Sequence, residues 1–181
     1  MDAARPNDPG DTLEIQSALE AFAARRAAQR GISAAQRALL QQYVAAMEEI
    51  ASGFESLSSE LLDRYVSMSR RFHQLVFELA ECAVLQRQVG DEFVSLYPFV
   101  LARAVTQARA EALRKFMLFE QDQHRSLIQA LVQRNSARAE ALAQEHAHFN
   151  QRFLAVWQEG MRAMVWPYTL IHKQAEPVSA A

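Results

Sequence analysis

Apolar residues recur every three or four positions along most of the chain, and short segments containing Gly, Ser or Pro interrupt this spacing at a few places. Such spacing is the period of an α-helix, and strand-like alternation of useful length is missing from the sequence. Gly31 and Gly53 each end one apolar run, and Ser33 follows the first as a candidate N-cap. Ala, Leu, Gln, Arg and Glu, which lose little freedom in a helix, dominate the composition. The sequence therefore predicts an all-α protein.

The spacing predicts six or seven helices in one antiparallel bundle. The first begins near Thr12, and Ser58 or Ser59 begins the third. After about Ala80 the pattern becomes irregular, which predicts a helix interrupted or kinked at Gly90 or Pro98. The regular segments are expected at 12–30, 34–52, 59–80, 111–134 and 136–166.

With 181 residues, half of them hydrophobic, the chain is long enough for one sizeable core, so a single domain is expected. Residues 1–11 are rich in Pro, Gly and Asp and are predicted to form a disordered tail or the stub of a linker. Residues 12–166 are predicted to form the helical domain. Pro167 is expected to end its regular part, which leaves residues 167–181 as a C-terminal tail.

Charge and composition exclude several classes of protein. The formal net charge of −2 argues against direct DNA binding by this chain, because nucleic-acid binders concentrate positive charge. The sequence contains one cysteine, no signal-peptide pattern, and no apolar run near the roughly 20 residues that a membrane-spanning helix needs. We therefore expect a cytoplasmic protein without a membrane segment.

Three histidines lie on the apolar faces of three different predicted helices. Residues three, four and seven apart share one helix face. By this rule His73 lies with Val66 and Val76, His124 with Met117 and Leu131, and His146 with Ala139 and Ala143. One such histidine is most simply a core side chain with a single hydrogen bond. Three of them also fit a shared site, since imidazole nitrogens bind divalent transition metals such as Zn or Ni.

Other chemistry finds little support in the sequence. A ferritin-like di-iron bundle needs two Glu-x-x-His pairs, and only Glu145 and His148 have this spacing, on a polar face. Cys82 has no local base that marks it as a nucleophile. A Gly-rich phosphate loop is also missing from the sequence. We therefore expect that the chain is not an enzyme, and a metal-dependent hydrolase or oxygenase ranks last among its functions.

The order and spacing of these segments resemble the FCD domain, the all-helical ligand-binding domain of one branch of GntR-type transcription regulators. "EIQSALEAFAARRAAQRGISAAQRALLQQYVAAMEE" resembles its first two helices, "RRFHQLVFELAECAVLQ" its Phe-His helix, and "QHRSLIQALVQRNSARAEALAQEHAHF" its last two histidine-bearing helices. The resemblance covers about residues 12–155. It implies an FCD-like bundle that binds a small-molecule effector, such as an organic acid, and forms a homodimer.

The resemblance also implies site residues. In many FCD domains a metal is bound by an Asp and three histidines, and the positions that match these histidines are His73, His124 and His146. The Asp position is Ser69 here, so one anionic ligand is missing. The helix-1 Arg that can meet an effector carboxylate is matched by Gln16, and the Asn of a Gly-Asn turn by Cys82. We treat Gln16, Ser69 and Cys82 as candidate ligand-binding residues.

Two further expectations concern the surroundings of the site and the partners of the chain. The Glu of the family's Glu-His pair is Gln123 here, which implies a loss of support for the metal ligands. Family members carry a winged helix-turn-helix before this domain, so DNA binding is expected only through such a domain, and the chain is expected to be either an excised portion or a stand-alone sensor. The competing hypothesis is a ligand-free dimerisation module with structural histidines.

Overall fold

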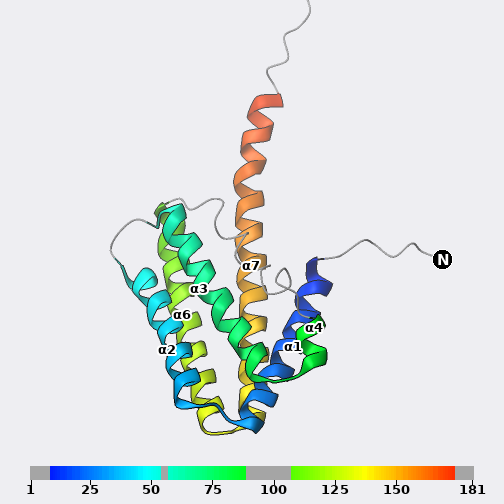
Figure 1. The fold of residues 1–181 in the computed structure, drawn as a ribbon. Helices are drawn as coiled ribbons and strands as arrows, with labels where there is room; N and C mark the ends of the chain where they lie inside the picture. The colour runs from blue at the N-terminus through cyan, green and yellow to red at the C-terminus, as the bar shows by residue number, and fades with distance from the viewer. Residues whose placement is uncertain (1–8, 54–56, 89–106, 174–181) are drawn as a thin grey trace, which may run out of the picture. The chain divides into compact units, whose positions relative to one another are not determined.

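The computed structural model describes residues 9–53, 57–88 and 107–173, and in these ranges the chain forms six α-helices and no strand (Figure 1). The predicted all-α class is therefore confirmed. None of the helices in these ranges is long and apolar enough to cross a lipid bilayer. The predicted interruption at Gly90 or Pro98 lies outside the described residues. The helices are α1 (Pro9–Arg30), α2 (Ala34–Ser52), α3 (Ser59–Leu79), α4 (Ala83–Gln88), α6 (Gln107–Val132) and α7 (Ser136–Lys173).

Local capping explains why α2 and α3 begin and end where the sequence predicts. Ser33 accepts a hydrogen bond from the backbone N–H of Gln36, and the Gln36 side chain accepts one from the backbone N–H of Ser33, which forms a capping box. Gly53 is the C-cap of α2. The Ser58 side chain accepts a hydrogen bond from the backbone N–H of Leu61 at the start of α3. These three boundaries are confirmed.

The outer ends of the first and last helices differ from the prediction. Helix α1 begins at Pro9 and not near Thr12, because a proline in the first helical turn leaves no intrahelical hydrogen bond unmade. Helix α7 continues through Pro167 to Lys173. A proline inside a helix removes one backbone hydrogen bond and need not end the helix. The division into tail, domain and C-terminal tail stays a prediction.

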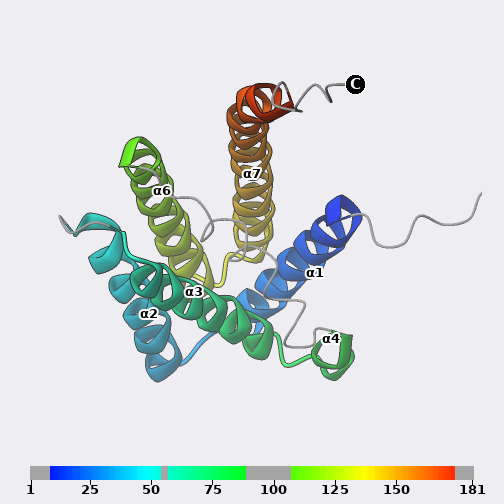
Figure 2. The ribbon, with the colours of Figure 1, turned by 90° about the horizontal axis from the view of Figure 1, so that it is seen from above.

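Contacts between the helices divide the chain into two units, Met1–His148 and Phe149–Ala181. Within the first unit, α2 packs against α3 and α6, and α1 also packs against α3 and α6. Figure 2 shows α3 passing across both α1 and α2. Helices distant in the sequence therefore share one core in this unit.

Two interhelical turns lie side by side at one end of this unit (Figure 1). Gly31, between α1 and α2, has a φ of +83°, and its N–H donates to the Ala27 carbonyl. Arg134, between α6 and α7, has a φ of 55°, and its guanidinium donates to the Arg30 carbonyl. The Asn135 side chain accepts a hydrogen bond from the Arg138 N–H at the start of α7. These contacts join the α1–α2 turn to the α6–α7 turn.

The core of the first unit is mostly apolar but includes a few buried polar side chains. Helix α1 contributes mainly alanines, whose small side chains let neighbouring helices approach closely. Helices α2, α3 and α6 contribute larger side chains, including Leu40, Met47, Phe72, Leu113 and Leu131. His124 and Gln121 on α6 are among the largest fully buried side chains as well. Buried polar groups need hydrogen-bond partners, so the surroundings of these two side chains are the first candidate for a site.

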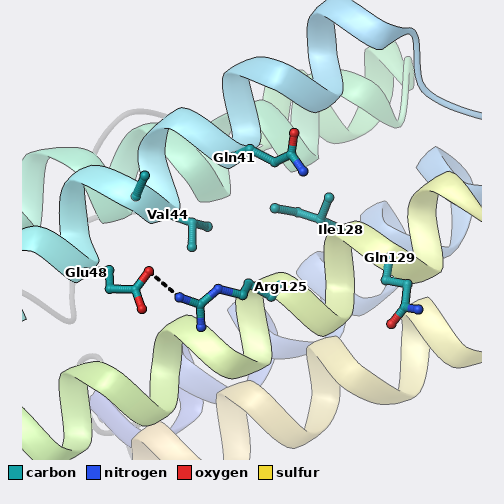
Figure 3. Close-up of a pocket in the computed structure, with 7 residues that line it drawn as sticks. Gln41, Val44, Glu48, Arg125, Ile128 and Gln129 are labelled. Atoms are coloured by element: carbon teal, nitrogen blue, oxygen red, sulfur yellow. Dashed lines mark ion pairs between the residues drawn. The ribbon is translucent and has the colours of Figure 1, made fainter.

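A separate pocket of about 390 Å³ lies between α2 and α6. Figure 3 shows the Glu48 carboxylate of α2 and the Arg125 guanidinium of α6 paired across it. Val44 and Ile128, both buried, are among the apolar residues that line it. None of the predicted site residues lines this pocket.

Candidate metal centre

The rings of His73, His124 and His146 lie together in the first unit, although they belong to α3, α6 and α7. Their centroids are 5.2 Å apart for His73 and His124, 5.3 Å for His73 and His146, and 4.7 Å for His124 and His146. One possible ligand atom from each ring lies within 4.8 Å of the others. The three histidines that helical spacing directs inward are therefore close neighbours.

Apolar packing on each helix places these rings. The exposed fraction of His124 is 1% and that of His146 is 5%. The ring of Phe72, the residue before His73, lies 4.2 Å from the His124 ring, centroid to centroid. Each histidine shares its helix face with buried apolar residues, among them Val76, Leu131 and Ala143, and these carry the imidazoles into the core.

The environment of His124 fixes which of its nitrogens carries hydrogen. Its Nδ1 lies 3.1 Å from Gln121 Oε1. The amide nitrogen of Gln121 donates to the Tyr65 hydroxyl and to the Met117 carbonyl, which leaves the amide oxygen facing the ring. An amide oxygen only accepts, so Nδ1 is the protonated nitrogen of His124. The lone pair is then on Nε2.

The other two rings follow the same arrangement. His146 Nδ1 lies 2.9 Å from Gln123 Oε1, and His73 Nδ1 contacts a carboxylate oxygen of Glu20 on α1. On all three rings Nδ1 therefore donates to a side-chain oxygen, and Nε2 is the nitrogen suited to a metal. Gln123 keeps the supporting contact whose loss the sequence implied, and what it lacks is the charge of a Glu.

Nε2 of His124 is buried and has no hydrogen-bond partner among the described residues. A buried polar atom without a partner costs about 1 to 3 kcal/mol, so such an atom in a native core needs an explanation. A metal ion accepts a lone pair and would provide that missing partner. Three imidazoles suit Zn, Ni or a similar divalent ion and leave coordination positions open. The residues present therefore fit a metal centre.

Electrostatics keep two of the three rings neutral. Burial, with the nearby His73, lowers the pKa of His146 to about 3. Burial, with His146 and His73, also holds the pKa of His124 well below its usual value. Metal ligands must be neutral imidazoles, so both rings are in the binding form at neutral pH.

His73 and Glu20 form a largely buried pair of a base and an acid. Burial lowers the pKa of His73, but the charge and hydrogen bond of Glu20 together with the charge of Glu120 outweigh burial, so the pKa of His73 is raised. Burial raises the pKa of Glu20, but the charge and hydrogen bond of His73 together with the charge of His146 outweigh burial, so the pKa of Glu20 is lowered. The side-chain exposed fractions are 14% for His73 and 8% for Glu20. The carboxylate is therefore ionised beside the ring.

A second buried carboxylate, Glu120, lies on α6 one turn before His124. Its Oε2 accepts a hydrogen bond from the Tyr65 hydroxyl at 2.8 Å, and its Oε1 lies 4.0 Å from His146 Nε2. Burial and the Glu120 charge raise the pKa of Tyr65 well above its usual value, so the phenol stays protonated and donates. Tyr65 and Gln121 thereby connect Glu120 to His124.

The structure places the three predicted ligand-binding residues differently. Gln16, one turn before Glu20 on α1, is buried, and its Oε1 has no hydrogen-bond partner in the described part of the chain. Ser69 is half-buried one turn before His73. Cys82 is a half-buried free thiol before α4, and its carbonyl accepts the Gln86 N–H. The group of possible metal ligands contains the three histidines and does not include Cys82.

Sequence reasoning missed four polar residues around the rings. Glu20 and Gln121 contact His73 and His124, and Tyr65 links Gln121 to Glu120. The sequence contains a signal for Glu20 and Glu120. Glu20 shares its helix face with three fully buried alanines, Ala23, Ala24 and Ala27, and Glu120 shares one with Leu113, Phe116, Met117 and Leu127. The rule of three, four and seven residues that selects the histidines also selects these two carboxylates.

Comparison with protein-family models matches residues 11–149 to the FCD domain, a stretch that includes all three histidines and Glu20. No curated protein matches the chain. FCD domains are regulatory domains of GntR-type transcription regulators, with roles in effector binding and dimerisation. Since the match covers most of the sequence and agrees with the all-helical fold, the chain belongs to the FCD domain family.

Proposed function

We propose that the chain senses a small metabolite in the cytoplasm, through a divalent transition metal held by Nε2 of His73, His124 and His146. The observation that carries this proposal is the common arrangement of the rings: each Nδ1 meets a side-chain oxygen, and the buried Nε2 of His124 lacks a partner among the described residues. When bound, the metal would offer open coordination positions to an effector such as an organic acid.

The residues around the centre supply orientation. Gln121, Gln123 and Glu20 hold the three Nδ1–H groups, so each ring presents its other nitrogen to the ion. The contributing side chains come from α1, α3, α6 and α7. An effector that binds better to one packing of these helices than to another shifts their equilibrium. In a homodimer that carries DNA-binding domains, such a shift would change how those domains are presented.

The second candidate function is a ligand-free dimerisation module. The observation that favours it is that all three Nδ1 atoms already have partners, as structural histidines would. Under this alternative each ring contributes to stability through its own contact. The unpartnered Nε2 of His124 favours the metal-binding function instead.

Metal content of the purified, tag-free chain tests the proposal. We expect the protein to carry or take up Zn or Ni at a single site, measured by mass spectrometry of metals and by calorimetry. Separate His73→Gln, His124→Gln and His146→Gln variants should each lose this binding. His148→Gln is the matched control, because His148 is exposed on the same helix as His146. A chain that takes up no metal would contradict the proposal.

Pairwise combinations of these substitutions separate the two candidate functions. A shared site predicts that stability changes measured with Zn are strongly non-additive, because the first substitution already removes the ion. The ligand-free module predicts additive changes that Zn does not alter. The free energy of unfolding of single and double variants, with Zn and with EDTA, therefore distinguishes the two functions.

The effector class is tested by a thermal-shift screen of carboxylic acids. Gln16 is neutral and cannot pair with a carboxylate as an Arg would, so we expect acids to stabilise the metal-loaded protein and to leave the metal-free protein unchanged. Acids that stabilise both forms equally would show that the metal does not contact the effector.

A further inference from the structure

A divalent cation bound to His73, His124 and His146 would need negative charge nearby. Three neutral imidazoles around a divalent cation would leave two positive charges in a buried place, and buried charge is costly unless opposite charge lies close by. Ser69, one turn before His73, offers a hydroxyl and no charge. The carboxylates near the rings lie on other helices, because Glu20 of α1 contacts His73 and Glu120 of α6 lies 4.0 Å from Nε2 of His146.

Helix α1 brings a carboxylate to this place. Glu20 contacts Nδ1 of His73, and the Glu20 side chain is 8% exposed. Glu20 is not one of the residues whose possible ligand atoms lie within 4.8 Å of one another, so it reaches the centre through the His73 ring. A carboxylate on the far nitrogen of a metal-binding histidine fixes the ring tautomer and strengthens the ring as a ligand.

We propose that Glu20 is the positioning residue that supplies, through His73, the negative charge that Ser69 does not. This inference rests on the proposed metal-binding function. It makes α1, which has no histidine at the centre, part of the metal site. Glu120 faces the centre differently, because its Oε2 accepts a hydrogen bond from Tyr65 and its Oε1 lies 4.0 Å from Nε2 of His146. The Nδ1 atoms of the three rings meet Glu20, Gln121 and Gln123 instead.

The test compares the zinc affinities of full-length Glu20→Gln and Glu14→Gln. Both substitutions remove one carboxylate from α1 and keep the side-chain length, but Glu14 is exposed. We expect Glu20→Gln to weaken zinc binding about 10- to 100-fold in competition with a chromophoric chelator, since loss of such support has this effect. Glu14→Gln should bind as the wild type does. Unchanged affinity in Glu20→Gln would overturn the inference.

A second substitution keeps the test decisive if Glu20→Gln also alters folding. Ser69→Asp in the Glu20→Gln background returns a carboxylate from α3, and we expect it to restore most of the lost zinc affinity. Because a carboxylate at position 69 can strengthen zinc binding by itself, Ser69→Asp is also made in the wild type, where we expect a smaller gain in affinity. Equal gains in the two backgrounds, or an affinity that stays at the Glu20→Gln level, would contradict the inference.

A nitrogen-detected NMR spectrum of the histidine rings gives a readout that does not depend on affinity. In the zinc-loaded wild type, His73 should show a protonated Nδ1 whose resonance shifts in Glu20→Gln and stays unchanged in Glu14→Gln. If the wild type binds neither Zn nor Ni, the proposed function itself fails. If the wild type binds and Glu20→Gln binds equally well with an unshifted resonance, only the role of Glu20 fails.

Discussion

His124 is surrounded by protein on every side, yet one of its ring nitrogens lacks a partner among the described residues. We expect His124→Met, a change to an apolar side chain, to alter the free energy of unfolding of the metal-free protein by no more than about 1 kcal/mol. The substitution removes an unsatisfied polar atom but also leaves Gln121 Oε1 without its donor, and these effects oppose each other. Urea unfolding in EDTA measures the change.

The same variant should lose the entire increase in melting temperature that Zn gives to the wild type, because one of three ligands is gone. A loss of several kcal/mol in EDTA would contradict the prediction, since it would show that the ring stabilises the fold without a metal.

The pKa of His146 predicts how stability of the metal-free protein depends on pH. Because this pKa is about 3 in the folded protein and 6.5 in the unfolded chain, protonation favours unfolding. The contribution of His146 to stability is complete above pH 6.5 and is lost as the pH falls from there toward 3. The charged and titratable groups that face it are His73, Glu20, His124 and Glu120.

His73 acts in the opposite sense, because its raised pKa makes its contribution largest below pH 6.5 and smaller as the pH rises through the folded-state pKa. His146→Gln isolates one of the two contributions. Between about pH 7.5 and 5, we expect the wild type in EDTA to lose more free energy of unfolding than His146→Gln does. His148→Gln should behave as the wild type, and equal pH dependence in all three proteins would contradict the prediction.

At the scale of helices, the turn between α1 and α2 depends on Gly31. Its φ of +83° is unfavourable for any residue with a Cβ, and a Cβ there would lie 2.7 Å from Arg134 Nε. We expect Gly31→Ala to lower the free energy of unfolding by about 1 to 2 kcal/mol. Gly53→Ala is the matched control, since Gly53 has a φ of −59° and its Cβ would lie 3.4 Å from the Glu49 carbonyl. Equal losses in the two variants, from denaturant unfolding, would contradict this.

Helix boundaries and side-chain partners differ in how well the sequence predicts them. The ends of α2 at Ser33 and Gly53 follow from local caps, and the sequence predicts both. The pairing of His73 with Glu20 joins residues 53 positions apart. It depends on which helices are neighbours, and the spacing within one helix carries no information about that.

At the scale of the whole first unit, the centre brings together side chains of α1, α3, α6 and α7. If a metal binds there, α1, α3 and α6 should open less often, and amide hydrogen exchange in them should slow when Zn is added. Helix α2 contributes no side chain to the centre, so its exchange should change less. Exchange measured by mass spectrometry checks this, and slowing that is uniform over all helices or strongest in α2 would contradict it.

The sequence by itself determined the helical class, the caps within the domain and the inward direction of three histidines, because all of these depend on residues within a few positions of one another. Only the tertiary structure decided that the three rings meet, and that Gln121, Gln123 and the buried Glu20 of α1 contact their Nδ1 atoms. Most of these contacts join different helices. They exist because packing of the apolar faces brings distant polar groups into one buried place, where each must find a partner.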